Sequence, residues 1–302
     1  MGICSQPDKP KSDPVPSFID ISAVFSLKLS LKQVMHLLSV PTAGSLLQAE
    51  VNILGKLSHP NLVKLLGYCH EKEVPLVYEF MQNDCLNYHL FGKGSIQPLP
   101  WDIRLKVAVG ITQGLAYLHS PEVLVIHRDL RSSNILLDKR IHNTDVTSMF
   151  WFYSSSIMQR YQILAWHQFF HLMIPVSKLV MGTYGYAAPE IMRAGRFYAK
   201  SDVFSFGVVL VEMLTGSRAI DTKRPNGKDV VVNWVIPFLS NKRKLKKKTM
   251  DTRLEGKYPI KEASLIAQFA IRCLQLEPKF RPSMKEIAET SEQIVAHQLK
   301  AT

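Results

Sequence analysis

Apolar positions in the first third of the chain are grouped in short runs. The runs 62–68 and 76–80 combine branched aliphatic and aromatic residues, and the polar stretch 70–73 separates them. Short apolar runs on either side of a polar turn are typical of paired β-strands. The pattern therefore predicts a small unit that contains β-structure.

From residue 101 onward the apolar positions recur at helical spacing instead. A long helix is expected to bury one face, made of Ile103, Val107, Ile111, Leu115 and Leu118. The segment 203–214 is apolar nearly all round, which predicts a helix at the centre of a core. A last amphipathic helix is expected to bury Leu265, Ile266, Phe269, Ala270 and Cys273.

Two further segments bear on the organisation of the chain. In 45–57 the apolar residues fall on one helical face, and Glu50 lies on that same face, either at its edge or facing a partner. In 139–176, by contrast, aromatic residues are dense and no turn signal occurs before Pro175. That segment is too polar to span a membrane, and we assign no element to it.

Charge and cysteine content narrow the class of protein. The 302 residues carry 37 Lys and Arg against 25 Asp and Glu, a formal net charge of +12. Part of the excess lies in 241–248, which is either a solvated loop or a targeting or lipid-binding patch. The sequence has neither zinc-type cysteine spacing nor an aromatic-basic repeat, so no nucleic-acid partner is expected. Four scattered cysteines without a secretory signal indicate a reduced, cytosolic compartment.

The first residues, MGICSQ, qualify that location. Gly2 after the initiator is the requirement for N-myristoylation, and Cys4 offers a site for palmitate. Two acyl chains anchor a protein stably, whereas one binds membranes only marginally. The alternative is an ordinary start on a disordered tail, which we place at 1–17.

The candidate chemistry lies in the run IHRDLRSSNILLD at 126–138. It matches the protein kinase catalytic loop, in which the carboxylate, here Asp129, accepts the proton of the substrate hydroxyl and the amide, here Asn134, holds a magnesium ion. A carboxylate and an amide five residues apart on a tight loop can address the attacking oxygen and the metal together. The run GTYGYAAPE at 182–190 then matches the end of a kinase activation segment, in the expected order.

With these motifs the chain resembles the plant receptor-like cytoplasmic serine/threonine kinases. Other matching phrases are SHPNLVKLLGYC at 58–69, LVYEFM at 76–81, KSDVFSFGVVL at 200–210 and LTGSRAID at 214–221. The resemblance implies an α+β, two-lobed fold, with a truncated β-rich N-lobe at 18–82 and a helical C-lobe at 83–290. It leaves 139–176 as an atypical insert and 291–302 as a tail.

The resemblance also implies roles for individual residues. The catalytic loop would contribute Arg128 and Arg131 beside Asp129 and Asn134. Glu50 would pair a lysine, and the hinge at Glu79 and Met81 would contact adenine. The structural residues would be Thr183 in the substrate-docking loop, a Glu190–Arg281 ion pair, and Asp202 bracing the catalytic loop.

Several parts of the family pattern are missing from this sequence. No Gly-x-Gly-x-x-Gly precedes Glu50, and neither Lys28 nor Lys32 follows a Val-Ala-Ile-like run. No Asp-Phe-Gly follows the catalytic loop, where Asp145 is a poor substitute. Both gaps fall where family-like sequence stops abruptly, which suggests an altered exon structure. Arg131 also stands where serine/threonine kinases usually have lysine, whereas Thr183 favours serine/threonine specificity.

Three functional hypotheses remain open at this stage. The first is an active kinase that uses ATP and Mg²⁺, phosphorylates protein substrates or acts beside receptor kinases, and works as a monomer at the cytoplasmic face of the plasma membrane. The second is a pseudokinase that binds partners through its C-lobe. The third is a non-functional product of an altered gene model. Because three phosphate-positioning parts are missing, we expect catalysis to be impaired.

Overall fold

The computed structural model describes residues 55–68, 76–79, 81–92, 98–138, 183–225 and 227–299. The chain divides into two compact units, one made of 1–43 and 65–80 and the other of 44–64 and 81–302. Within the predicted N-lobe at 18–82, the described residues 55–64 group with the larger unit. Predictions about Gly2, Cys4, Lys28, Lys32, Glu50, Asp145 and the insert 139–176 lie outside the described residues.

The described part of the smaller unit is a β-hairpin. Strand β1 (Leu65–Tyr68) pairs antiparallel with β2 (Leu76–Tyr78), with Leu65 opposite Tyr78 and Tyr68 opposite Leu76. The register shifts between Leu65 and Gly67. Both predicted strands are confirmed, although each is shorter than its apolar run.

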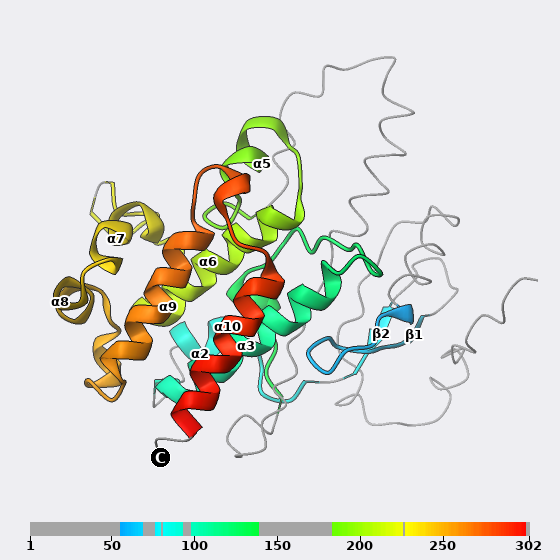
Figure 1. Cartoon of the computed structure of the whole chain (residues 1–302), viewed down its shortest axis with the longest axis horizontal. Coiled ribbons are helices and arrows are strands. Elements are labelled where there is room, and N and C mark those ends of the chain that lie inside the picture. The colour runs from blue at the N-terminus through cyan, green and yellow to red at the C-terminus, as the bar shows by residue number, and fades with distance from the viewer. Residues whose placement is uncertain are drawn as a thin grey trace, which may run out of the picture. The chain divides into compact units, whose positions relative to one another are not determined.

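The named elements of the larger unit in the described ranges are helices and single turns, joined by loops that contain two isolated β-bridges (Figure 1). The helical C-lobe of the predicted fold class is thereby confirmed. Its longer helices are α3 (Trp101–Leu118), α6 (Ala199–Thr215), α7 (Val231–Leu239), α9 (Ile260–Cys273) and α10 (Met284–Leu299). Its short helices are α2 (Leu86–Phe91), α5 (Pro189–Ala194) and α8 (Lys242–Lys244). Single turns are η2 (Ser132–Asn134), η4 (Leu245–Thr249), η5 (Thr252–Leu254) and η6 (Pro278–Phe280).

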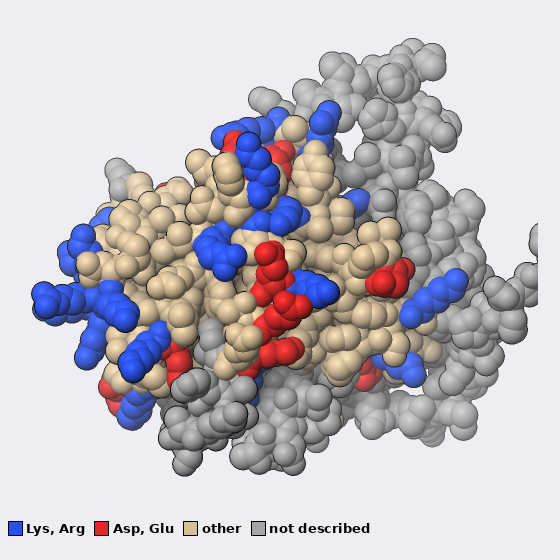
Figure 2. Space-filling model, in the orientation of Figure 1, with Lys and Arg blue, Asp and Glu red and all other residues tan. Residues whose placement is uncertain are grey.

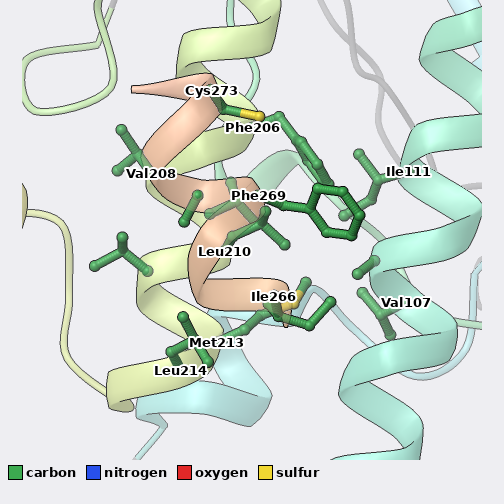
Figure 3. Close-up of a cluster of buried hydrophobic side chains, with 14 of the residues drawn as sticks. Val107, Ile111, Phe206, Val208, Leu210, Met213, Leu214, Ile266, Phe269 and Cys273 are labelled. Carbon is green, nitrogen blue, oxygen red and sulfur yellow. The ribbon is translucent and has the colours of Figure 1, made fainter. Parts of the chain in front are cut away.

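Three helices form the core of this unit. Figure 3 shows side chains of α3, α6 and α9 meeting, with Ile111, Phe206 and Phe269 among them. Helix α6 is buried along nearly its whole length, as its all-round apolar sequence predicts. A Cβ at Gly207 would lie 2.8 Å from the Cβ of Cys273, so glycine allows α6 and α9 to pack closely. The predicted buried face of α3 is likewise confirmed.

Two expectations about the C-terminal helices are wrong. Leu265 is 41% exposed, so it lies outside the buried face of α9 that the other four predicted residues share. Helix α9 is also followed by α10, which continues past residue 290, where a tail is predicted. A capping box starts α10: Ser283 N donates to Glu286 Oε2 (2.6 Å), and Glu286 N donates to Ser283 Oγ (3.2 Å).

The basic run at 241–248 is helical, which corrects the expectation of a loop. Asn241 accepts hydrogen bonds at its side chain from the backbone N–H groups of Arg243 and Lys244, which caps α8. Leu245 at the start of η4 is fully buried and holds the segment against the core. The basic side chains themselves are exposed, as a solvated run requires.

Residues 55–64 are fixed to the larger unit by contacts with α3 and the core. Leu57 and Leu62 pack in the core cluster, and the His59 ring stacks on Tyr117 with centroids 5.0 Å apart. Ser58 N donates to the Tyr117 hydroxyl (3.3 Å). Among the described residues, no helix is long and apolar enough to cross a membrane.

Candidate active site

The catalytic loop is held in place by backbone contacts with the start of α2. Leu86 N donates to Ile135 O (2.7 Å), and Leu137 N donates to Asp84 O (2.9 Å). Arg128 adopts a left-handed backbone conformation with φ of +72°. Such a conformation is costly for a residue with a side chain. The surrounding contacts therefore fix the direction of the chain just before Asp129.

Asp129 is the meeting point of the predicted catalytic residues. Asn134 Nδ2 donates both to the backbone carbonyl of Asp129 (2.8 Å) and to its carboxylate Oδ2 (3.0 Å). Thr183 Oγ donates to the other carboxylate oxygen (2.6 Å) across 54 residues of sequence. Both oxygens of the predicted proton acceptor thus receive a hydrogen bond that fixes its orientation.

The two predicted arginines of the loop each have a recorded contact, one with a carboxylate and one with an aromatic ring. The Arg131 guanidinium Nε is 3.6 Å from Asp129 Oδ2, and its side chain is 38% exposed. The Arg128 guanidinium lies over the Phe197 ring, 5.3 Å from its centroid. The Arg131 guanidinium is therefore within ion-pair distance of the Asp129 carboxylate.

Asp202, in the first turn of α6, binds the catalytic loop through three donors. Its carboxylate accepts hydrogen bonds from the backbone N–H groups of His127 and Arg128 and from His119 Nε2, each at 2.8 Å. Burial alone would raise the pKa of Asp202, but the His119 hydrogen bond and the neighbouring charges lower it below its ordinary value. Asp202 is therefore an ionised brace for the loop, in the position predicted for it.

His127, the first residue of the His-Arg-Asp triplet, is buried beside this brace. Its Nδ1 accepts the backbone N–H of Asp129 at 3.2 Å. Burial lowers the pKa of His127 to about 4, although Asp202 and Asp129 act to raise it. The ring is therefore neutral at physiological pH, which suits its role as an acceptor within the loop.

Glu190 and Arg281 form the predicted ion pair. Two guanidinium nitrogens of Arg281 contact the two carboxylate oxygens of Glu190, each at 2.7 Å, and Ser201 Oγ also donates to Glu190 (2.7 Å). Arg281 is fully buried and also donates to the backbone carbonyl of Lys200 (2.8 Å). Burial would raise the pKa of Glu190, but hydrogen bonds from Arg281 and Ser201 lower it. The pair joins the activation segment to the start of α6.

This arrangement agrees with the comparison to known families. The protein kinase domain family matches residues 25–291. The chain belongs to the protein kinase family. It is 47% identical over 248 residues to "Probable serine/threonine-protein kinase PBL10" of Arabidopsis thaliana, which covers 82% of this chain and 57% of that protein.

Other relatives of the same kind support this family assignment. The chain is 46% identical over 247 residues to "Serine/threonine-protein kinase BIK1" of Arabidopsis thaliana, covering 81% of this chain and 59% of the relative. It is 44% identical over 248 residues to "Receptor-like cytoplasmic kinase 176" of Oryza sativa subsp. japonica, covering 82% and 59%. The resemblance to plant receptor-like cytoplasmic kinases is thereby confirmed. The chain spans less than two thirds of the length of these relatives.

A second buried network, which the sequence motifs did not predict, lies beside the catalytic loop of this kinase domain. Tyr186 donates its hydroxyl proton to Glu212 Oε1 (2.7 Å), and its oxygen lies 3.1 Å from Ser132 Oγ in η2. The backbone N–H of Ala219 also donates to Glu212 Oε1 (2.9 Å). Burial raises the pKa of Glu212 to about 7, despite the hydrogen bonds from Tyr186 and Ala219 that lower it. The acid Glu212 within the apolar run 203–214 is the signal that could have identified this network.

His119 and the pair Arg104–Asp251 were also missed. His119 follows α3 and reaches Asp202, and nothing in its local sequence indicates that contact. Arg104, 1% exposed on α3, donates to Asp251 Oδ2 (2.7 Å) and to the Met213 carbonyl (2.6 Å). An arginine among the apolar positions of α3 is a signal for such a buried partner.

The nucleotide side of this kinase domain is described only in part. Glu79 follows β2 in the smaller unit, and Met81 begins the second segment of the larger unit. Their predicted contact with adenine, and the lysine partner of Glu50, stay predictions.

Few of the described side chains could bind a magnesium ion beside Asp129. Asn134 uses its Nδ2 on Asp129, which leaves its amide oxygen as the atom that could bind a metal. Among the described residues, no three His, Cys, Asp or Glu side chains gather as metal ligands. Magnesium usually takes one or two carboxylates together with substrate phosphates. The described residues alone therefore do not form a complete magnesium site.

Proposed function

We propose that this chain is a serine/threonine protein kinase of plant signalling that holds the acceptor hydroxyl but transfers the phosphoryl group slowly. The supporting observation is the orientation of Asp129, whose two carboxylate oxygens receive hydrogen bonds from Asn134 and Thr183. A carboxylate held in this way is poised to accept the proton of a substrate hydroxyl. Asp202 supports that position through the backbone of the loop.

The acceptor would be a serine or threonine side chain. Thr183 contacts Asp129 directly and belongs to the segment that would receive the substrate peptide. Arg131 would neutralise charge on the transferred phosphate, because its guanidinium lies near Asp129 and is partly exposed. Arginine takes this role in place of the usual lysine and binds phosphate oxygens in pairs.

The proposed impairment comes from parts that the sequence lacks. There is no glycine-rich loop before Glu50, no lysine in a Val-Ala-Ile-like run, and no Asp-Phe-Gly triplet after Asp138. Phosphoryl transfer depends on positioning and electrostatic stabilisation, and the loss of one stabilising donor costs on the order of 10²–10³ in rate. Loss of three such parts leaves ATP and Mg²⁺ poorly placed for transfer.

A second candidate function is a pseudokinase scaffold for signalling partners. The observation that favours it is that both supports at the start of α6, Glu190–Arg281 and Asp202, are formed by C-lobe residues alone. A domain held by such contacts can present a binding surface without turning over ATP. A non-functional product of an altered gene model would instead show no cooperative thermal unfolding.

Autophosphorylation measured by mass spectrometry tests the proposed function. The parent chain and Asp129→Asn are incubated with ATP and Mg²⁺, after both have been shown to unfold cooperatively. We expect slow phosphorylation of the parent on serine or threonine and none of the variant. Equal signals from the two proteins would contradict the kinase proposal and favour the scaffold. Rapid phosphorylation that the Asp129 change abolishes would contradict the impairment.

We also propose that the chain acts as a monomer at the cytoplasmic face of the plasma membrane, near receptor kinases and their protein substrates. Support comes from the acylation pattern of Gly2 and Cys4 and from the name of the Oryza sativa relative, "Receptor-like cytoplasmic kinase 176". In plant cells, Gly2→Ala should move the protein to the soluble fraction, since a chain without myristate loses the first of the two anchors. Unchanged fractionation would contradict the acylation.

A further inference from the structure

We infer that the exposed cations of α8 and η4 form a second membrane contact, which binds anionic lipid head groups independently of any acyl chain. We call this cluster the basic surface, made of Lys242, Arg243, Lys244, Lys246, Lys247 and Lys248. In Figure 2 blue side chains gather at the edge of the molecule where α8 lies in Figure 1. The proposal extends the proposed membrane location but uses a different part of the chain.

The local structure presents these cations to solvent as a group. Asn241 caps the segment by accepting the N–H groups of Arg243 (3.0 Å) and Lys244 (3.1 Å). Leu245 is fully buried and directs the turn towards the core, whereas all six cationic residues around it are exposed. The basic surface is therefore an ordered part of the fold with its charges already facing outward.

The charge of the basic surface is not neutralised within the described residues. No ion pair in the described ranges includes any of its six side chains. The next acid along the chain, Asp251, is buried and already paired with Arg104 and Arg253. Lys248 lies over the Phe238 ring, 5.5 Å from its centroid, and that contact leaves its charge in place. Six positive charges within seven residues are thus available to an external anion.

The composition of the basic surface favours a lipid bilayer over a folded protein partner. Protein interfaces are depleted in lysine and rely on buried aromatic or arginine anchors. The basic surface has five lysines and one arginine, and its neighbour Phe238 is half-buried beneath Lys248. Flexible, strongly hydrated lysine charges suit a diffuse layer of anionic head groups.

The same composition argues against single-stranded nucleic acid. Proteins that bind such strands combine a basic groove with exposed aromatic rings on which successive bases stack. Here one aromatic ring, Phe238, lies beside the cations, and Lys248 covers one of its faces. A bilayer surface requires no stacking platform and remains the occupant that the observations favour.

The expected strength follows from the number of cations. Each lysine or arginine near an anionic bilayer surface contributes roughly a fivefold gain in partitioning. Removing three of the six charges should therefore weaken binding on the order of 100-fold. Because exposed charges are screened by salt, the interaction should also weaken steeply as ionic strength rises.

Vesicle sedimentation with the full chain made in bacteria tests the inference without acylation. The protein is mixed with vesicles of phosphatidylcholine alone or of phosphatidylcholine with phosphatidylserine, at low and high salt. We expect sedimentation with the anionic vesicles at low salt, little at high salt, and none with phosphatidylcholine. Binding to neither type of vesicle at low salt would overturn the inference. Because the protein made in bacteria carries no acyl chain, that result would not bear on the acylation of Gly2. The fractionation of Gly2→Ala in plant cells tests that proposal separately.

A pair of charge-matched variants locates the interaction. The patch variant carries Gln at Lys246, Lys247 and Lys248, and the control variant carries Gln at Lys56, Lys279 and Lys285, which are also exposed. Both lose three charges, and thermal melts verify that both fold. We expect the weakening of vesicle binding only in the patch variant. Equal binding by the two variants would overturn the assignment, as would retention of an oligonucleotide or an acidic peptide without vesicle binding.

Discussion

The two ends of helix α6 each carry a buried carboxylate, yet the environments shift the two pKa values in opposite directions. Asp202 at the first turn accepts three hydrogen bonds, one of them from His119, and its pKa is lowered. Glu212 in the last turn accepts two, from Tyr186 and Ala219, and burial raises its pKa to about 7. The depth of burial is the same, since each is 1% exposed.

The comparison shows that the donors, and not the depth, decide the protonation state. A carboxylate that receives several N–H donors and faces a histidine stays ionised in a low-dielectric site. At Glu212, with one hydroxyl and one amide as donors, the desolvation cost is larger than the gain, and the pKa rises to about 7. Asp202, at the charged end, braces the catalytic loop. Glu212, whose pKa is raised, joins Tyr186 to Ala219 in the loop that follows α6.

The largest loss of stability should come from removing Arg281, the cation that contacts the start of α6. Arg281→Ala leaves Glu190 in place without its bidentate partner and deprives the Lys200 carbonyl of a donor. Stranding a buried charge costs about 3–5 kcal/mol. Urea unfolding should show that loss in the free energy of unfolding. A loss below about 1 kcal/mol would mean that the pair contributes no more than an exposed one.

A smaller loss of stability is expected from neutralising Asp202, which braces the catalytic loop. Asp202→Asn keeps the shape of the side chain but removes its charge and one of its acceptors for His127, Arg128 and His119. Hydrogen bonds to charged groups contribute roughly 1.5–3 kcal/mol each, so we expect a loss of about 2–3 kcal/mol. Urea unfolding at neutral pH measures it, and stability equal to the parent would show that Asp202 is not ionised.

The raised pKa of Glu212, in the last turn of α6, should make the stability of the protein depend on pH. The folded-state pKa of Glu212, about 7, exceeds its ordinary value of 4.5, so the folded protein binds the proton more tightly. This contribution to stability is complete below the ordinary value and is lost as pH rises through 7. Between pH 5 and 7 it should decrease by about 2 kcal/mol.

Comparison with Glu212→Gln isolates this contribution. His127, with a pKa lowered to about 4, acts oppositely over the same range, and it is present in both proteins. The variant should therefore gain stability relative to the parent as pH rises, as measured by urea unfolding at each pH. Parallel profiles for the two proteins would contradict a protonated Glu212.

The smallest effect on stability should be at the catalytic carboxylate. Asp129→Ala removes the acceptor for Thr183 and Asn134, but the Asp129 side chain is 18% exposed and its closest cation, Arg131, is 38% exposed. No deeply buried charge is stranded, and the loss should stay below about 1 kcal/mol. A melting shift as large as that of Arg281→Ala would show that Asp129 serves the scaffold.

Sequence patterns predicted the parts of the fold that depend on local periodicity. The buried face of α3 and the fully buried α6 follow directly from the spacing of apolar residues. Helix α10 was missed even though Ser283 and Glu286 form the signature of a capping box. The basic run was interpreted as a solvated loop or a lipid-binding patch from its charge alone, without the cap at Asn241 or the buried Leu245 that make it helical.

In the candidate site, motif positions were sufficient to predict a contact where the family pattern names both partners. Glu190 and Arg281 contact each other, and Asp202 contacts the catalytic loop, as the family pattern predicts. The partners of Glu212 could not be inferred in the same way. Tyr186 is 26 residues away in sequence, and neither residue carries a pattern that points to the other. Long-range contacts of this kind arise from packing alone.

Both ends of α6 are hydrogen-bonded to the catalytic loop, Asp202 directly and Glu212 through Tyr186. The proposed function holds that the acceptor side of phosphoryl transfer is built, whereas the nucleotide side lacks its usual parts. ATP titration by calorimetry, with and without Mg²⁺, tests the claim most directly. We predict weak binding through the hinge at Glu79 and Met81 that Mg²⁺ does not strengthen, because the sequence has no Asp-Phe-Gly aspartate. Tight binding that requires Mg²⁺ would contradict the claim, and would show that Asp145 or a lysine near residue 30 fills the missing role.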